Sequence, residues 1–209
     1  MSANTVSNPV ISSLLLIGGG GHCRAVADVL EALHVPIAGI VDKNTDIVMP
    51  YPVLGDDEDL PQLREHYSFA LVTIGQITNT AIRKNIFAML EKLNFSIPCI
   101  ISQTAYISPT AICGNGTVVL HNSMINAYSK IGNNCIINTK SLIEHDCIIG
   151  DHCHISTGTI VNGGVIIGNN CFIGSGSIIK QGITIHDNCF INMGMKIAHD
   201  VPPNTRLLK

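Results

Sequence analysis

The sequence predicts a chain of two parts: a small Rossmann-like α/β domain over residues 1–95 and a parallel β-helix over residues 96–209. A strand, a glycine-rich turn, a helix and a second strand follow one another near the N-terminus. A six-residue repeat without insertions then runs over residues 101–203. The composition agrees with this division, because 46% of the residues are hydrophobic and only 13% are charged, as an aliphatic β-helix interior requires.

The six-residue repeat consists of two columns of side chains. Every member of the first column, from Ile101 to Ile197, is Ile or Val except Cys113. The second column starts four residues later at Ala105, ends at Val201 and contains mainly small residues. β-Branched residues suit short buried strands, and small residues fit a tight interior corner. Three repeats therefore close one triangular coil, and residues eighteen apart stack at about 4.8 Å.

The same lattice accounts for most of the eight cysteines. Cys113 falls in the aliphatic column, and the small interior column contains Cys135, Cys147, Cys153, Cys171 and Cys189. We expect these to be small buried hydrophobes and not a disulfide framework. The segment from Cys147 to His154 also has zinc-like spacing. The lattice points its two thiols inward on successive faces and His154 outward, so we expect no metal site.

Charge and hydropathy limit the partners and the location. The net charge of −3 is too small to indicate a nucleic acid or a membrane surface as a partner. No run of eighteen apolar residues occurs, so we expect no membrane-spanning segment. Residues 1–13 contain no Lys or Arg and do not resemble a signal peptide. We therefore expect a cytoplasmic protein.

The N-terminal part is predicted to be a βαβ unit, with strands at residues 13–17 and 37–41 and a helix at 22–33. The glycines at 18–21 place backbone N–H groups at a helix N-terminus, where a phosphate binds well. Asp42 lies about twenty residues past the turn, where a ribose hydroxyl is often held. Cys23 or Arg24 replaces the third glycine of the dinucleotide pattern, and the domain is too short for two nucleotide halves. We expect one phosphorylated ligand, such as a nucleotide sugar; the alternative is that the glycines only form a tight turn.

A second strand–helix pair follows. The strand at residues 69–74 ends at Gly75, and such a strand end is where open parallel sheets bind ligands. The helix at residues 80–93 carries Ile82, Ile86 and Leu90 in helical register.

The turn around His145 departs from the Gly, Asn and Asp residues that fill most other corners of the repeat. One coil later, Gly163 and then Gly164 occupy the same corner. A glycine stacked beside a histidine leaves a bare groove in which a long, thin molecule can reach the imidazole. Glu144 and Asp146 flank the histidine, and an adjacent carboxylate can fix its tautomer and raise its basicity. These features favour a general base, with an inert solvated histidine as the alternative.

Five segments resemble the hexapeptide-repeat sugar acetyltransferases, a family that includes the bacillosamine-type nucleotide-sugar N-acetyltransferases and the sialic acid O-acetyltransferase group. They are LLLIGGGGHCRAVADVL at 14–30, IVDKN at 40–44, TIGQ at 73–76, IRKNIF at 82–87 and NTKSLIEHDCIIGDHCHIS at 138–156. The resemblance covers residues 14–209. It implies that the β-helix is left-handed, that three chains form a homotrimer, and that acetyl-CoA lies in the cleft between adjacent β-helices.

The resemblance also implies roles for individual residues. His145 matches the general base, Asp146 the acid that increases its basicity, and Asn138 an asparagine near the acceptor group. The implied acetyl-CoA contacts are His154, Gly163, Ser175 and Met193. The implied nucleotide-sugar contacts are Gly20, Gly21 and His22 at the phosphates, with Asp42, Lys43 and Gly75 at the nucleotide and sugar. Residues 200–206 depart from the usual Gly-x-Pro-Ala ending, which leaves the adenine contacts open, and the four consecutive glycines leave the nucleotide open.

The implied reaction is transfer of an acetyl group from acetyl-CoA to the 4-amino group of a nucleotide-linked amino-dideoxy or amino-trideoxy sugar, for bacterial surface glycan or glycoprotein synthesis. UDP is the expected nucleotide. A thioester is already activated, so direct transfer with a general base requires neither a metal nor an enzyme nucleophile. Two alternatives stay open: O-acetylation of a sialic-acid-like sugar, and a non-catalytic β-helix that binds nucleotide sugar.

Overall fold

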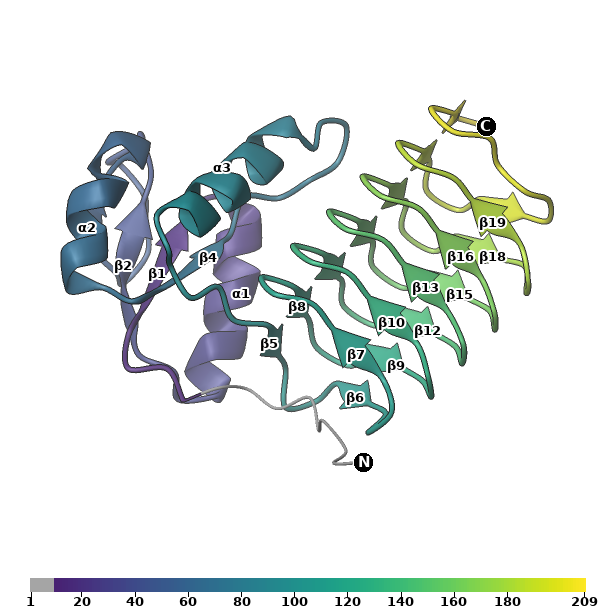
Figure 1. Ribbon diagram of the computed structural model, residues 1–209, viewed down its shortest axis with the longest axis horizontal. Coiled ribbons are helices and arrows are strands. Elements are labelled where there is room, and N and C mark those ends of the chain that lie inside the picture. The colour runs from purple at the N-terminus through teal and green to yellow at the C-terminus, as the bar shows by residue number, and fades with distance from the viewer. Residues whose placement is uncertain (1–9) are drawn as a thin grey trace.

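The structure is a computed structural model that describes residues 10–209. Residues 1–9 lie outside the described residues. They make up most of residues 1–13, the segment that was predicted not to be a signal peptide. Within the described part, no helix combines the length and the apolar character needed to cross a bilayer. Figure 1 shows two bodies side by side: helices packed around a small sheet, and a row of stacked coils.

The first body is a parallel sheet with the strand order β3-β2-β1-β4. Its elements are β1 (Leu14–Ile17), α1 (Gly21–Ala32), β2 (Ile37–Val41), β3 (Val53–Gly55), the 3-10 turn η1 (Asp57–Asp59), α2 (Leu60–His66), β4 (Phe69–Val72) and α3 (Ala81–Lys92). The central strand β1 is apolar throughout and fully buried, because a parallel sheet is covered on both faces. The predicted βαβ unit is confirmed, whereas β3, η1 and α2 were not predicted.

The buried face of α3 differs from the prediction. Ile82 is 60% exposed, while Ile86 and Leu90 are buried together with Arg83 and Phe87. The predicted register of Ile82 is wrong because α3 packs against the β-helix as well as against its own sheet. This second contact draws Arg83 and Phe87 inward and leaves Ile82 in solvent.

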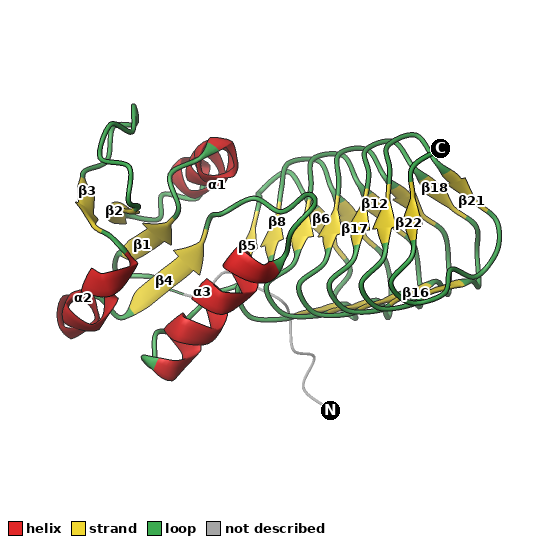
Figure 2. Cartoon of the chain, turned by 90° about the horizontal axis from the view of Figure 1, so that it is seen from above, coloured by secondary structure: helices red, strands yellow, loops and turns green. Residues whose placement is uncertain are grey.

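The second body is a left-handed parallel β-helix with three flat faces (Figure 2). The β5–β22 face contains β5 (Ile100–Ile101), β8 (Val118–Val119), β11 (Ile136–Ile137), β14 (His154–Ile155), β17 (Phe172–Ile173), β20 (Phe190–Ile191) and β22 (Arg206–Leu207). The β6–β21 face contains β6 (Tyr106–Ile107), β9 (Met124–Ile125), β12 (Leu142–Ile143), β15 (Ile160–Val161), β18 (Ile178–Ile179) and β21 (Lys196–Ile197). The β7–β19 face contains β7 (Ile112–Cys113), β10 (Lys130–Ile131), β13 (Ile148–Ile149), β16 (Ile166–Ile167) and β19 (Thr184–Ile185). Paired residues lie eighteen apart, as Ile137 and Ile155 do, which confirms the predicted stacking.

The corners of the coils use left-handed backbone conformations. From Gly116 to Gly194, every sixth residue has a φ between 53° and 71°. Glycine and asparagine adopt this conformation at little cost and fill most of these places. Tyr128, Lys140 and His152 also adopt it, so the stacked coils impose the conformation on residues that disfavour it.

The polar side chains of the small interior column connect successive coils. Thr117 donates from Oγ1 to Gly132 O at 2.7 Å and accepts from the N–H of Cys135 at 3.0 Å. Cys135 in turn donates from Sγ to Gly150 O at 3.1 Å and accepts from the N–H of Cys153 at 3.4 Å. The same donation to a carbonyl is made by Ser123, Ser129, Cys147, Cys153, Thr159, Cys171, Ser177 and Cys189. The predicted interior position of the five column cysteines is confirmed, and the column requires hydrogen-bonding capacity in addition to small size.

The repeat shortens in its last coil. Ile185 pairs with Val201 and Phe190 pairs with Arg206, so each pair is two residues closer in sequence than the pairs before it. Val201 therefore takes a place in the aliphatic column. Its predicted place in the small column, and the prediction of an unbroken repeat to residue 203, are wrong. The tighter turn is closed by Asp200, whose Oδ1 accepts from the N–H of Thr184 at 2.8 Å.

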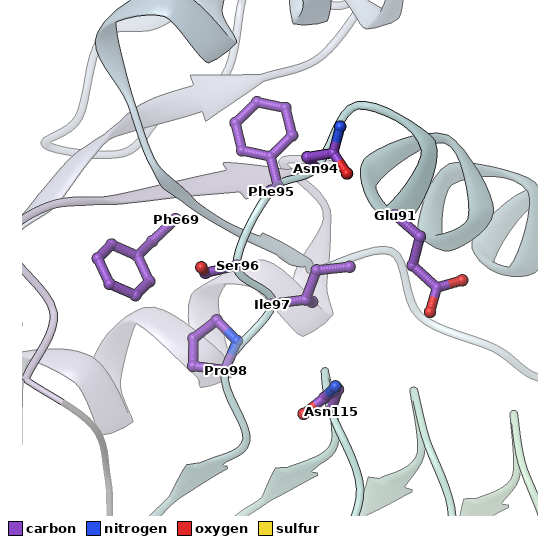
Figure 3. Close-up of a pocket in the computed structure, with 8 residues that line it drawn as sticks. All are labelled: Phe69, Glu91, Asn94, Phe95, Ser96, Ile97, Pro98 and Asn115. Carbon is purple, nitrogen blue, oxygen red and sulfur yellow. The ribbon is translucent and has the colours of Figure 1, made fainter.

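A linker between α3 and β5 joins the two bodies. Ser96 still forms a bridge with Phe69 of β4, so the chain leaves the α/β sheet only after this residue. Ile97 and Pro98 then line a cavity of about 630 Å³, with Asn115 of the first coil on its other side (Figure 3). This cavity lies at the amino end of β4, and none of the predicted site residues lines it. The predicted division at residue 95 stays a prediction.

Candidate functional site

His145 and Asp146 form a hydrogen-bonded pair at a corner between the β6–β21 and β7–β19 faces, here called the His145 corner. The distance from His145 Nδ1 to Asp146 Oδ2 is 2.8 Å. Because an ionised carboxylate only accepts hydrogen bonds, Nδ1 is the donor in this bond, and in the neutral imidazole Nε2 is then the nitrogen that accepts. Nε2 lies over Gly163, where an added β-carbon would be 2.6 Å from it. The predicted stacking of the imidazole on this glycine is confirmed.

A cavity of about 530 Å³ opens beside the imidazole. It is lined by Glu144, His145, Asn162, Gly163, Gln181 and Gly182. Glu144 turns its carboxylate away from the imidazole, because its Oε2 accepts from Asn126 Nδ2 at 3.0 Å. Of the two flanking acids, Asp146 is the hydrogen-bond partner of the histidine.

Asn138 lies at a different corner, between the β5–β22 and β6–β21 faces, here called the Asn138 corner. Its Nδ2 is 3.0 Å from His154 Nε2, and His154 Nδ1 is 2.5 Å from Gln76 O. A carbonyl can only accept, so His154 is protonated on Nδ1 and its Nε2 accepts from Asn138. Asn138 Oδ1 accepts from the N–H of Thr139 at 2.7 Å. These bonds fix the orientation of the Asn138 amide.

His154 points away from the β-helix interior but is only 8% exposed, because the α/β unit covers it. Burial lowers its pKa to about 4; the bond to Gln76 opposes this shift and the charge of Arg83 adds to it. The imidazole is therefore neutral at neutral pH. Its ring also stands edge-on to Phe172, with centroids 5.2 Å apart. Its implied contact with acetyl-CoA stays a prediction.

Ser175 and Met193 share the Asn138 corner. The N–H of Gly194 donates to Ser175 O at 2.9 Å, which places the two turns on successive coils. Met193 is 73% exposed. Apart from His154, which lies on β14, the predicted site residues of the β-helix therefore occupy two separate corners, on either side of the β6–β21 face. One chain alone does not bring Asn138 and His145 together.

The predicted nucleotide-sugar residues lie at the carboxyl edge of the α/β sheet. They are Gly20, Gly21, His22, Asp42, Lys43 and Gly75. Asp42 connects the turn after β2 to the glycine turn after β1, because its Oδ2 accepts a hydrogen bond from the N–H of Gly19 at 2.7 Å. The space above Gly20 and Gly21 is open, since an added β-carbon would meet nothing within 4 Å. β1 lies between β2 and β4, so all three strand ends meet at one edge, where open parallel sheets bind ligands.

His22 lies beneath this edge, against the β-helix. Its Nε2 is buried without a hydrogen-bond partner among the described residues. Burial lowers its pKa well below the ordinary value, and the charge of Arg83 and the neighbouring His154 lower it further. A neutral His22 thus lies between the glycine turn and the Asn138 corner.

Arg83 has no role that the sequence patterns predict, yet it is only 1% exposed. Its Nη1 donates to Val72 O and Ile74 O, each at 2.8 Å, and its Nε donates to Asn134 O at 3.3 Å. The guanidinium therefore connects the carboxyl end of β4 to a corner of the β-helix. One sequence signal could have indicated that Arg83 is buried: it follows Ile82 directly and lies on the same face of the predicted helix as Ile86.

Other contacts hold the two bodies together. Gln76 Nε2 donates to His152 O at 2.8 Å. Asp28 of α1 forms an ion pair with His121 of the β-helix, with 2.8 Å between Oδ2 and Nε2. These contacts fix the carboxyl edge of the sheet beside the Asn138 corner.

The segment from Cys147 to His154 brings no ligands together. The thiols of Cys147 and Cys153 donate to backbone carbonyls at different corners. His154 is occupied by Gln76 and Asn138. Within residues 10–209, no group of three or more His, Cys, Asp or Glu side chains is arranged to hold a metal ion.

Comparison with known families identifies both parts of the chain. Residues 13–90 match the PglD N-terminal domain. Residues 128–163 match the bacterial transferase hexapeptide (six repeats), and residues 164–197 match the hexapeptide repeat of succinyl-transferase. A comparison with curated proteins finds no match.

Three solved structures illustrate the likeness. A histidine-to-asparagine mutant of perosamine N-acetyltransferase from Caulobacter crescentus, in complex with CoA and GDP-perosamine, is 33% identical, with a TM-score of 0.89 over 96% of this chain and 94% of that one. The acetyltransferase domain of PglB from Neisseria gonorrhoeae, in complex with acetyl coenzyme A, is 31% identical, with a TM-score of 0.85 over 94% of this chain and 95% of that one. WeeI from Acinetobacter baumannii is 20% identical, with a TM-score of 0.77 over 95% and 97%, and it supports the fold alone.

Proposed function

Because the chain belongs to the hexapeptide-repeat sugar acetyltransferases of the bacillosamine type, we propose that it transfers the acetyl group of acetyl-CoA to the 4-amino group of a nucleotide-linked aminodeoxysugar. The observation that carries this proposal is the His145–Asp146 pair, which holds the imidazole beside an open cavity. The neighbouring structures support the choice of substrates, since they hold CoA, acetyl-CoA or GDP-perosamine.

In the proposed mechanism His145 is the general base. The sugar amine attacks the thioester carbonyl, Nε2 of His145 removes a proton from the amine, and Asp146 stabilises the imidazolium. The C–S bond of the intermediate then breaks, the amide is formed, and the CoA thiolate takes the proton back from the His145 imidazolium. Transfer is direct, because the column cysteines donate their thiols to backbone carbonyls inside the coils and none faces the groove.

We assign the nucleotide sugar to the carboxyl edge of the α/β sheet. Gly20 and Gly21 would hold the phosphates at the N-terminus of α1, and Asp42, Lys43 and Gly75 would contact the nucleotide and sugar. UDP is the nucleotide expected from the sequence, and GDP is the second candidate because a neighbour binds GDP-perosamine. The product would serve bacterial surface glycan or glycoprotein synthesis, and the reaction would take place in the cytoplasm.

The active enzyme in this proposal is a homotrimer with its sites between subunits. Asn138, Ser175 and Met193 lie at one corner and His145 and Gly163 at the next, so a ligand that touches both sets requires a second copy. Two faces also expose apolar side chains that association would cover. These are Tyr106, Met124 and Ile178 on the β6–β21 face, and Ile112, Ile148 and Ile166 on the β7–β19 face.

A thiol-release assay with acetyl-CoA tests the proposal. The acceptor panel contains UDP-, GDP- and dTDP-linked 4-aminosugars and sialic acid, with His145→Ala as the matched control. We expect thiol release with at least one nucleotide-linked aminosugar and a product heavier by one acetyl group. Thiol release with sialic acid alone would favour O-acetylation, and no release with any acceptor would favour a non-catalytic nucleotide-sugar-binding protein.

A further inference from the structure

Two thiols at the beginning of the β-helix differ from the other six. Cys99 and Cys113 are partly exposed, whereas every other cysteine of the chain is buried. Cys113 packs against the aliphatic core of the coils and is the one member of its column that is not Ile or Val. Cys99 lies six residues before Ala105, so it takes the first place of the small interior column. Both residues therefore belong to interior columns at the coil that begins the β-helix.

The fold brings these two residues to the same corner. The N–H of Ile100 donates to Thr117 O at 2.9 Å, so Cys99 lies one coil before Thr117 at this corner. Cys113 ends β7, and the N–H of Thr117 donates to Gly114 O at 3.4 Å. This bond closes the turn that leads from Cys113 to the corner.

The hydrogen bonds of the interior column place the Cys99 thiol beside Cys113. Thr117 donates to the carbonyl of Gly132, fifteen residues later, and the cysteines above it at the same corner repeat this offset. The same offset from Cys99 leads to residue 114, directly after Cys113. A hydrogen bond with the Cys113 thiol, and then burial, raise the pKa of Cys99 well above its ordinary value. The two sulfur atoms are therefore neighbours.

We propose that Cys99 and Cys113 form a site of reversible oxidation, at which a hydroperoxide converts the two thiols into a disulfide. Cys113 reacts first, because the hydrogen bond holds the proton on Cys99. Its sulfur attacks the peroxide, the O–O bond breaks, and a sulfenic acid and water are formed. The Cys99 sulfur then forms the S–S bond and displaces the hydroxyl group as a second water. Two thiols and one hydrogen peroxide thus give one disulfide and two water molecules.

Cys135 and Cys153 are a second pair of neighbouring thiols, but this pair is closed to such an oxidant. The two residues lie on successive coils, and the N–H of Cys153 donates to Cys135 Sγ at 3.4 Å. Both are completely buried, and each donates its thiol to a backbone carbonyl. Because oxidation follows exposure, we expect it at the first coil and not at this pair.

The disulfide would fasten the linker between the two bodies to the first coil. Cys99 directly follows Pro98, which lines the cavity between the α/β unit and the β-helix (Figure 3). A covalent loop over residues 99–113 restricts the unfolded chain, so the oxidised protein should resist denaturant better than the reduced one. The proposal does not depend on the proposed function, because none of the proposed site residues belongs to this coil.

Peptide mapping of the folded, full-length protein before and after hydrogen peroxide tests this proposal. We expect the intact mass to fall by that of two hydrogen atoms, with one crosslinked pair of peptides that contains Cys99 and Cys113. Dithiothreitol should restore the original mass. The denaturant midpoint of unfolding should rise on oxidation and return on reduction.

Cys99→Ser and Cys113→Val are the test variants, since serine suits the small column and valine the aliphatic one. Both should lose the crosslink and the shift in midpoint. Cys135→Ser is the matched control and should form the crosslink as the wild type does. A disulfide that includes Cys135 or Cys153 would overturn the proposal. So would a wild type that gains oxygen at Cys113 without a crosslink, or one that does not react.

Discussion

The Nε2 atom of His145 occupies the space that a β-carbon at residue 163 would need, since the two would be 2.6 Å apart. Gly163→Ala should therefore displace the imidazole while leaving the exposed corner folded. A misplacement of about 1 Å can cost about 10²-fold in rate, so we expect a loss in kcat of that order. The same change in a His145→Ala background should have little further effect, because no imidazole remains to be displaced. Full additivity of the two substitutions would contradict this account.

The histidines at the junction of the two bodies predict acid sensitivity. His154 has a pKa of about 4 in the folded chain, against an ordinary 6.5, and the pKa values of His22 and His152 are lowered too. As the pH falls below 6.5, the unfolded chain takes up protons that the folded chain does not, so the free energy of unfolding decreases. For His154 alone the loss on reaching pH 4 is on the order of 3 kcal/mol.

Denaturant unfolding between pH 7 and pH 4 measures this effect. His154→Gln should flatten the pH dependence, because glutamine does not titrate, while His199→Gln at an exposed turn is the matched control. An equal slope for wild type and His154→Gln would show that His154 is not the buried group responsible.

The six-residue repeat accounts for most of what the sequence predicts correctly. It is strictly local, so it locates the coils, the interior cysteines and the stack of His145 on Gly163. It fails after Ile197, where Asp200 closes a shorter turn and moves Val201 into the other column. The six-residue repeat contains no signal that marks the coil in which it ends.

Contacts between the two bodies were not predictable from local patterns. Ile82 fits the helical register, but the β-helix draws in Arg83 and Phe87 instead. His154 is outward by the lattice and buried by Gln76 and the rest of the α/β unit. A local sequence pattern does not show whether a distant part of the chain will cover a given residue in the folded protein.

The interior column predicts a difference between two substitutions of Cys135. Cys135→Ser keeps a donor for Gly150 O and an acceptor for the N–H of Cys153, as Thr117 does one coil earlier. Cys135→Ala leaves that buried N–H unpaired, which costs about 1–3 kcal/mol. Chemical denaturation should therefore rank wild type and Cys135→Ser above Cys135→Ala. Equal stability of the serine and alanine variants would show that only small size matters in this column.

The two-corner arrangement predicts complementation between inactive variants. In a cyclic trimer, each site would take His145 from one chain and Asn138 from its neighbour. His145→Ala and Asn138→Ala should each be weakly active alone. After unfolding and refolding together in equal amounts, every mixed trimer contains one intact site, so activity should recover to about one quarter of wild type. If both residues served the same site from one chain, mixing would restore nothing.

The central claim is that His145 removes the proton from the sugar amine. The most direct measurement is kcat for His145→Ala against wild type, with saturating acetyl-CoA and the best aminosugar of the panel. General base catalysis is worth about 10²–10⁴-fold, so kcat should fall by that factor while CoA affinity and the trimer persist. A His145→Ala enzyme with wild-type kcat would contradict the account.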